Sequence, residues 1–115
     1  MIESSLISFE DFLRVDIRAG TIISAEINPK AIKPAYKLLI DFGEEIGHKT
    51  SSAQIVQHYT PESLVGRQIL AVINFTPKRV AGVVSEVLVL AVVCHETGTV
   101  LIGPTQVVKN GERLA

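Results

Sequence analysis

The residues best suited to chemistry lie between positions 71 and 90, where a polar loop separates two apolar segments. The loop carries the basic pair Lys78 and Arg79, and it is flanked by Asn74, Ser85 and Glu86. Strands that fix such side chains, with apolar neighbours that keep water partly out, are suited to binding a polar ligand. The alternative is an ordinary hairpin whose loop is polar only because loops face solvent. The spacing of these residues leaves both interpretations open.

A second group of polar side chains lies on an unusually polar predicted strand, at Ser51, Ser52 and Gln54. Their short donors and acceptors suit sugar and phosphate oxygens, but a solvent-facing edge strand has the same composition. Lys33 and Lys37, on the preceding segment, are ordinary surface lysines when each is taken alone. Together the two groups favour a binding site more strongly than either does alone, because one face of a barrel could hold all of these side chains.

Catalytic and metal chemistry has little support in the sequence. His48, His58 and His95 are scattered without the spacing of metal ligands, so structural or surface roles are expected for them. Cys94 lies in an apolar segment, and the sequence assigns no neighbouring base to it. No glycine-rich phosphate loop precedes a helix. We therefore expect no enzymatic activity, no metal and no cofactor.

The composition predicts a single domain over residues 1–115. Hydrophobic residues make up 47% of the chain, and a net charge of −1 argues against a surface coated in basic residues for nucleic acid. Segment 67–86 nevertheless holds three basic side chains against one acidic side chain, so a modest basic patch is expected. The single cysteine, the lack of an apolar run near ~20 residues and an N-terminus without a basic leader predict a cytoplasmic protein that does not insert into membranes.

Hydrophobic periodicity predicts an all-β fold. The predicted strands span residues 15–27, 36–42, 48–55, 67–75, 87–93 and 99–102. Ser8 and Thr60 are capping residues for two short predicted helices, at the N-terminus and between strands. Gly20 lies in the middle of the first strand, where a barrel strand has to bend. These features indicate a five-stranded barrel of the oligonucleotide/oligosaccharide-binding type (OB-fold), extended by C-terminal strands.

Side-chain directions follow from the same patterns. In the first strand a single alternation is expected to place Ile17, Ile23 and Ile27 on one face, and in the second strand the alternate residues from 36 to 42 are expected to face inward. Strands 67–75 and 87–93 are apolar on both faces, so one face of each has to be covered outside the barrel. We expect the N-terminal helix, through Phe9 and its neighbours, to cover part of that surface and a second subunit to cover the rest.

Several motifs resemble those of the CsaA family, small chaperones linked to protein export whose fold is the tRNA-binding domain. These motifs are Phe12–Ile22, Lys33–Leu38, Ile40–Gly43, Ser51–Ile55, His58–Gln68, Asn74–Phe75 and Ser85–Leu90. The resemblance covers the chain from about Phe9 to Ala115, which is the expected ordered core. The same domain is appended to some methionyl- and phenylalanyl-tRNA synthetases.

The resemblance implies an OB-fold barrel, a homodimer, and binding of unfolded or preprotein segments without a cofactor. It also implies a nucleic-acid face, because basic loop residues and the Asn and Ser-Glu motifs mark that face in the tRNA-binding relatives. The corresponding positions are Asn74, Lys78, Arg79, Ser85 and Glu86, with Lys37, Ser51 and Ser52 on neighbouring strands. Val87-Leu88 stands where the synthetase-appended relatives have Gly-Met, and this departure favours the chaperone branch.

Two functions therefore remain in competition. The first is a dimeric, non-enzymatic chaperone that holds exposed apolar segments of other proteins. The second is a protein that binds the structure of tRNA through the loop around Lys78 and Arg79. One barrel face can serve both ligands, and an enzyme ranks well behind either.

Overall fold

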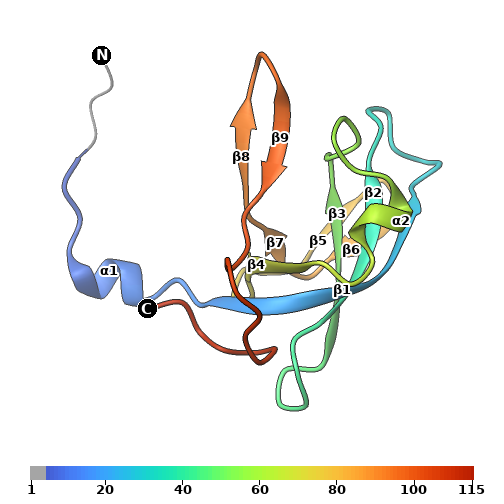
Figure 1. The fold of residues 1–115 in the computed structure, drawn as a ribbon. Helices are drawn as coiled ribbons and strands as arrows, with labels where there is room; N and C mark the ends of the chain where they lie inside the picture. The colour runs from blue at the N-terminus through green and yellow to red at the C-terminus, as the bar shows by residue number, and fades with distance from the viewer. Residues whose placement is uncertain (1–4) are drawn as a thin grey trace.

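A five-stranded antiparallel sheet, curled into a nearly closed barrel, forms the body of the protein (Figure 1). The elements are α1 (Phe9–Leu13), β1 (Ile17–Ile27), β2 (Tyr36–Asp41), β3 (His48–Ala53), α2 (Pro61–Leu64), β4 (Gln68–Val72), β5 (Lys78–Val80), β6 (Val83–Ser85), β7 (Leu88–Val89), β8 (Ala91–Cys94) and β9 (Gly98–Leu101). The barrel strands lie in the order β3-β2-β1-β4-β7, and two separate hairpins, β5-β6 and β8-β9, complete the sheet structure. The predicted all-β OB-fold barrel is confirmed. This computed structural model describes residues 5–115; Met1–Ser4, the start of the segment for which no basic leader was expected, lie outside the described residues.

Strand β2 supplies the centre of the core. Its alternate residues Tyr36, Leu38 and Ile40 are buried, as is Phe42 just after the strand, while Lys37 faces out. The predicted inward face of this strand is therefore confirmed. Other elements contribute further buried members of the same cluster: Ile22, Ile55, Tyr59, Leu64, Ile69, Ala71 and Val87.

Strand β1 is long, as predicted, but its alternation is interrupted. Its pairing with β2 shifts register between Ile22 and Ser24. A bulge of this kind inserts one residue, so the side chains beyond it change face. Ile22, before the bulge, is buried opposite Ile40, and Ile23 is the exposed extra residue. Beyond the bulge, Ala25 and Ile27 lie opposite Leu38 and Tyr36 on the same face as Ile22, with Ile27 exposed at the end of the strand. The prediction that Ile17, Ile23 and Ile27 share one face through a single alternation is wrong for this reason.

Both helices begin at the predicted capping residues. Ser8 and Asp11 form a capping box in α1, and Thr60 and Ser63 form one in α2. Helix α1 nevertheless points away from the barrel and buries none of its own residues (Figure 1). The prediction that it covers the outer face of the sheet is wrong, because hydrogen bonds at its junction with β1 direct it outward. Within residues 5–115 neither helix is long and apolar enough to cross a membrane.

The segment after β6 divides into two short strands instead of the single predicted strand over 87–93. Strand β7 pairs with β4, and the backbone of Leu90 then turns to receive a hydrogen bond from Ile102 N. Strand β8 pairs with β9 in a hairpin that stands out from the barrel (Figure 1). The side chains of Val92, Val93 and Val100 are exposed on this β8-β9 hairpin. Apolar surface on these strands is thus left open in the single chain.

Gly20 occupies the point where β1 passes closest to the core. A Cβ atom at this position would lie 2.7 Å from Ile40 Cγ2 and 2.7 Å from Phe42 Cδ1, which is closer than real side chains approach. Only glycine fits at this position, because the side chains of Ile40 and Phe42 occupy the space that a Cβ atom would need. The core side chains Ile40 and Phe42 pack directly against the backbone of β1 where the strand bends around the barrel.

Replacing Gly20 with Ala should lower the free energy of unfolding by about 1–3 kcal/mol, because the added methyl group overpacks the core. This loss should exceed the gain of about 0.4–1 kcal/mol that Gly→Ala brings through the unfolded chain. Urea denaturation followed by circular dichroism measures the change. Ser24→Ala, at an exposed position of the same strand, is the control and should change stability by less than about 0.5 kcal/mol. An unchanged or higher urea midpoint for Gly20→Ala would contradict this account of the core.

Candidate functional site

The predicted basic loop is itself a β-hairpin. Lys78 and Arg79 form most of β5, which pairs with β6 across a turn at Ala81 and Gly82. Both turn residues have positive φ, 47° and 84°, as the tight two-residue hairpin turn of type I′ requires. The Arg79 Nη1 atom donates to the Gly82 carbonyl at 3.4 Å. The expectation of a loop is corrected, and the basic pair is held on a strand of defined shape.

Thr50 of β3 and Glu86 fasten this hairpin to the barrel. The Glu86 backbone N–H donates to the Thr50 carbonyl at 2.8 Å, and the Thr50 N–H donates back to Glu86 Oε1 at 3.0 Å. The Thr50 hydroxyl donates to the Val84 carbonyl at 2.6 Å. Lys49 Nζ lies 3.9 Å from the second carboxylate oxygen of Glu86. The carboxylate of Glu86 is thus engaged in closing the barrel between β3 and β6.

The predicted serines lie at the same junction between β3 and residues 84–87, which we call the seam. The Ser51 and Ser85 hydroxyls both donate to the Val87 carbonyl, at 3.1 Å and 3.2 Å. The Ser52 backbone N–H donates to the Ser85 hydroxyl at 3.3 Å. Ser51 is only 1% exposed, whereas Ser52 and Ser85 are half-buried at the surface. Ser51 supports the seam from inside, and the other two serines reach its outer side.

Strand register brings two lysines into line with these serines. Lys37 lies opposite Ser52 across β2 and β3, and Lys78 lies opposite Ser85 across β5 and β6. Directly opposed residues project from the same face of a sheet, so each pair shares a face of its own sheet, and the hydrogen bond from Ser52 N–H to the Ser85 hydroxyl joins the two pairs. We call Lys37, Ser52, Ser85 and Lys78 the polar row. Arg79 follows Lys78 along β5 and therefore projects from the other face of the hairpin.

A second basic segment, which the sequence reasoning did not include, lies against the hairpin turn. Asn28 is buried in the β1-β2 loop, where its Nδ2 donates to the Ala81 carbonyl at 3.3 Å and its Oδ1 accepts from Lys30 N at 3.1 Å. The Lys30 side chain crosses Gly82, so that a Cβ there would meet Lys30 Cδ at 3.2 Å. A groove of roughly 420 Å³ separates loop and hairpin, lined by residues 26–30 and 81–83 together with Lys37.

General OB-fold architecture was the signal that could have pointed to this segment. In that fold the first inter-strand loop and the loop between the last two strands flank the ligand face. The sequence shows two prolines and two lysines between the first two predicted strands, at 29–34. The contact between Asn28 and the hairpin turn, however, joins residues more than fifty positions apart and leaves no local pattern.

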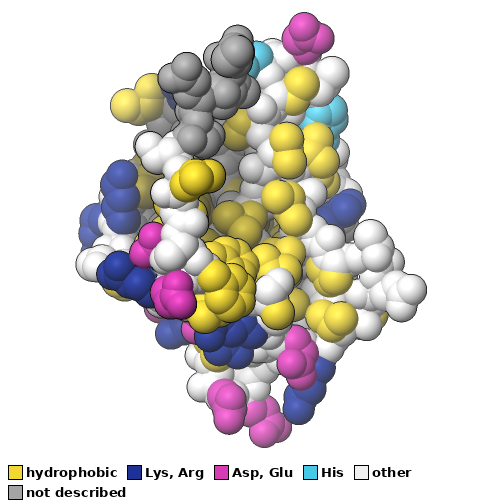
Figure 2. All heavy atoms as spheres, turned by 90° about the vertical axis from the view of Figure 1, so that its left-hand side faces the viewer, with side chains coloured by type: hydrophobic (Ala, Val, Ile, Leu, Met, Phe, Trp, Pro, Cys, Tyr) yellow, Lys and Arg dark blue, Asp and Glu magenta, His cyan; other side chains and the backbone are white. Residues whose placement is uncertain are grey.

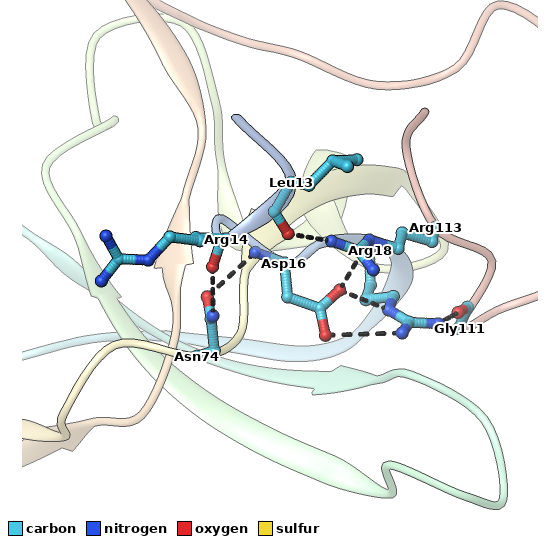
Figure 3. A network of polar contacts seen from close by, with 7 residues as sticks. All are labelled: Leu13, Arg14, Asp16, Arg18, Asn74, Gly111 and Arg113. Atoms are coloured by element: carbon cyan, nitrogen blue, oxygen red, sulfur yellow. Dashed lines mark hydrogen bonds and ion pairs between the residues drawn. The ribbon is translucent and has the colours of Figure 1, made fainter. Parts of the chain in front are cut away.

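Asn74 lies beside Arg14 and Asp16, at the junction between α1 and β1 (Figure 3). Its Oδ1 accepts from the Asp16 backbone N–H at 3.0 Å, and its Nδ2 donates to the Arg14 carbonyl at 2.7 Å. Both ends of the amide thus bind backbone groups at the junction between α1 and β1. The structure does not bring Asn74 together with Ser85 and Glu86, although all three flank the hairpin in sequence.

The described part of the chain, residues 5–115, holds no group of three His, Cys, Asp or Glu side chains that could bind a metal. Hydrogen bonding to the Thr97 side chain, and then to the Thr97 and Glu96 backbone, lowers the pKa of the Cys94 thiol. The Cys94 thiol is therefore hydrogen-bonded to a hydroxyl and to backbone groups, none of which is a general base. His58 Nε2 contacts the Thr97 carbonyl and helps seat the tip of the β8-β9 hairpin.

Comparison with protein families identifies the domain. A family model described as a putative tRNA-binding domain matches residues 17–113, which is most of the chain. The chain belongs to the tRNA-binding domain family. Methionine–tRNA ligase of Bacteroides fragilis, another protein of similar sequence, is 36% identical over 108 residues. That alignment spans 94% of this chain but only 16% of the ligase, so the chain corresponds to a small part of such relatives.

Solved structures of chaperones are similar over almost the whole chain. The crystal structure of the chaperone CsaA from Bacillus anthracis shares 50% identity with a TM-score of 0.91, and that of the CsaA chaperone protein from Picrophilus torridus shares 44% with a TM-score of 0.90. Each match covers 96% of this tRNA-binding domain and 100% of the CsaA chain. The resemblance to CsaA seen in the sequence motifs is confirmed.

Replacing Glu86 with Ala should lower the free energy of unfolding by about 1–3 kcal/mol, because the Thr50 N–H loses its carboxylate partner at the half-buried seam. Glu86→Gln is the matched control: it retains an oxygen acceptor and should cost less than about 1 kcal/mol. Urea denaturation of both variants gives the comparison. Equal losses in the two variants would assign the effect to the charge beside Lys49 and not to the hydrogen bond.

Proposed function

We propose that this protein is a non-enzymatic, homodimeric chaperone of the cytoplasm that binds unfolded or preprotein polypeptide segments in protein export, without a cofactor. The observation that carries the proposal is the amount of apolar side chain left exposed on a small chain. Leu6 is 99% exposed, Phe9 67% and Val93 66%. Soluble monomers rarely expose contiguous apolar patches beyond a few hundred Å² unless another molecule covers them. The likeness to two chaperone structures supports the same function.

Self-association accounts for one part of this surface. Residues 5–15, here called the N-terminal arm, carry the exposed side chains of Leu6, Ile7, Phe9 and Leu13. Figure 2 shows hydrophobic side chains gathered across the centre of the face from which the arm projects. On this face a groove of roughly 480 Å³ is lined by residues of the arm together with Asn74 and Phe75.

A two-fold dimer needs a surface that is complementary to itself. Here each copy offers both an apolar projection, the arm, and an apolar groove beside it. We therefore assign this face to a second copy of the chain. A stable dimer of this kind buries more than ~1,000 Å² in total.

The groove between the β1-β2 loop and the hairpin suits the client polypeptide. Ile27 lines it, and Ile32 of the same loop is fully exposed nearby in sequence. Lys30 and Lys37 stand at the same groove. Exposed branched side chains beside flexible lysine stems provide apolar contact for an extended segment without demanding a particular sequence.

Binding of tRNA is the second candidate, and a specific observation favours it. Within the polar row a lysine stands opposite a serine in each of two strand pairs, Lys37 opposite Ser52 and Lys78 opposite Ser85, and Arg79 is exposed on the other face of the hairpin. Phosphate oxygens accept from such groups, and the chain belongs to a tRNA-binding domain family. We include Lys37, Ser52, Lys78, Arg79 and Ser85 in this proposed RNA-contacting set, with Ser51 and Glu86 supporting it from the seam. Asn74 was expected in the same set, but its side-chain amide is hydrogen-bonded to the Arg14 carbonyl and the Asp16 N–H at the base of the arm.

The chaperone proposal is tested with reduced, carboxymethylated α-lactalbumin, a permanently unfolded polypeptide. Replacing both Ile27 and Ile32 with Ser should weaken its binding about tenfold, because two apolar side chains are lost from the contact surface. Fluorescence anisotropy at low and high salt should show little salt dependence, since buried area and not charge neutralisation drives the association. Val107→Ser removes an equally exposed apolar side chain from the C-terminal segment and should leave the affinity unchanged. No measurable binding by the parent protein would refute the chaperone function.

The tRNA proposal is tested by replacing Lys78 and Arg79 with Ala together. If both cations neutralise phosphates, the slope of log affinity against log salt for tRNA should shrink by roughly 1.5 to 2 units. Filter binding over a salt series measures the slope. Lys109→Ala, a cation outside the hairpin, is the control and should leave the slope unchanged. If the parent binds no tRNA at low salt, the second candidate fails; if the double variant loses tRNA and polypeptide binding equally, the hairpin serves the fold.

A further inference from the structure

The N-terminal arm cannot fix its own direction. Helix α1 has only five residues and none of them is buried, and isolated helices shorter than ~12–15 residues are marginal in water. An unsupported arm would therefore sample many orientations relative to the barrel. Its orientation has to come from contacts at the junction with β1.

Side chains from two distant segments bind the carbonyls at the end of this helix. Arg113, in the C-terminal segment, donates from Nη2 to the Leu13 carbonyl, and Asn74 donates from Nδ2 to the Arg14 carbonyl at 2.7 Å (Figure 3). The last carbonyls of a helix have no partner within the helix. A cation placed there is also favoured by the helix dipole. The barrel thus caps the arm from outside.

Asp16 joins the two capping residues into one network. Its backbone N–H donates to Asn74 Oδ1 at 3.0 Å, and its carboxylate lies 3.5 Å from Arg113 Nε and 2.7 Å from Arg18 Nε. Arg18 in turn donates from Nη1 to the Gly111 carbonyl at 2.9 Å. Figure 3 shows these side chains converging from the start of β1, the end of β4 and the C-terminal segment. The exit of the arm from the barrel is fixed on both sides.

We propose that Asn74 and Arg113 are positioning residues for self-association, which hold the arm in the outward orientation that a second copy of this chain receives. The inference rests on the proposed homodimer and goes beyond it by naming two residues that act through hydrogen bonds at the base of the arm, Asn74 at the edge of the groove and Arg113 in the C-terminal segment. Orientation fixed in advance lowers the entropy lost when the second copy binds. A second copy is the partner because the apolar arm and the groove beside it lie on one face of the same chain.

The experiment measures the dimer dissociation constant of the full chain by sedimentation equilibrium. Asn74→Ala removes the acceptor for Asp16 N–H and the donor for the Arg14 carbonyl, and it should raise the dissociation constant about tenfold or more. Arg113→Ala provides a second, independent variant and should act in the same direction. Gln106→Ala removes an exposed side-chain amide from the C-terminal segment and should leave self-association unchanged. Urea denaturation identifies any variant that has lost its fold.

A double-mutant cycle distinguishes a residue that positions the arm from a residue that only stabilises the barrel. In a chain carrying Phe9→Ser and Leu13→Ser, which weaken the apolar contact of the arm, adding Asn74→Ala should change the dissociation constant less than twofold. A residue that merely stabilises the barrel would weaken both backgrounds equally. The salt dependence of tRNA binding should be the same for Asn74→Ala and the parent, because the row and the hairpin are untouched.

The outcomes distinguish the two levels of the proposal. A parent protein that stays monomeric at all accessible concentrations overturns the homodimer and the positioning role with it. A dimeric parent whose affinity survives both Asn74→Ala and Arg113→Ala overturns the positioning role alone. Equal weakening in the two backgrounds of the cycle also overturns it.

Discussion

Strand β1 is hydrogen-bonded along both edges, and the rest of the structure depends on that constraint. Its first half pairs with β4 and its second half with β2. Beside the β4-paired half, the other edge is occupied by the C-terminal segment, where Ala19 N donates to the Glu112 carbonyl and Leu114 N to the Ile17 carbonyl. One strand can serve three neighbours only if it bends and changes register midway. The space at Gly20 and the bulge beyond Ile22 meet those two requirements.

This arrangement also places the two ends of the chain at one location. The arm leaves the barrel where the C-terminal segment arrives, so Arg113 reaches the Leu13 carbonyl across a hundred residues of sequence. The polar row, by contrast, lies on β2, β3 and the β5-β6 hairpin. Contacts proposed for a second copy and those proposed for polypeptide or tRNA therefore use different elements. Assembly and ligand binding need not compete for the same side chains.

Much of the fold could be predicted from the sequence because its signals are local. The alternation in β2 and the capping residues Ser8 and Thr60 each depend on a few neighbouring positions, and the structure confirms them. The bulge in β1 could not be predicted, since it arises from pairing with a distant strand. The site was predicted in part for the same reason. Strand register places Lys37 opposite Ser52, and a hydrogen bond joins Ser52 to Ser85, whereas Asn74 bonds to backbone groups of residues 14 and 16, which are distant in sequence.

The turn of the β5-β6 hairpin has a consequence for how the protein responds to heat. Ala81 adopts φ 47°, a left-handed conformation that costs a residue with a side chain roughly 1–2 kcal/mol. The buried Asn28 amide holds the Ala81 carbonyl from the neighbouring loop, and an isolated two-stranded hairpin is marginally stable at best. The shape of the hairpin is therefore maintained from outside it. On warming, the β1-β2 loop and the hairpin should loosen as one unit before the barrel melts, so the ligand binding proposed for the hairpin should be lost reversibly while the core remains folded.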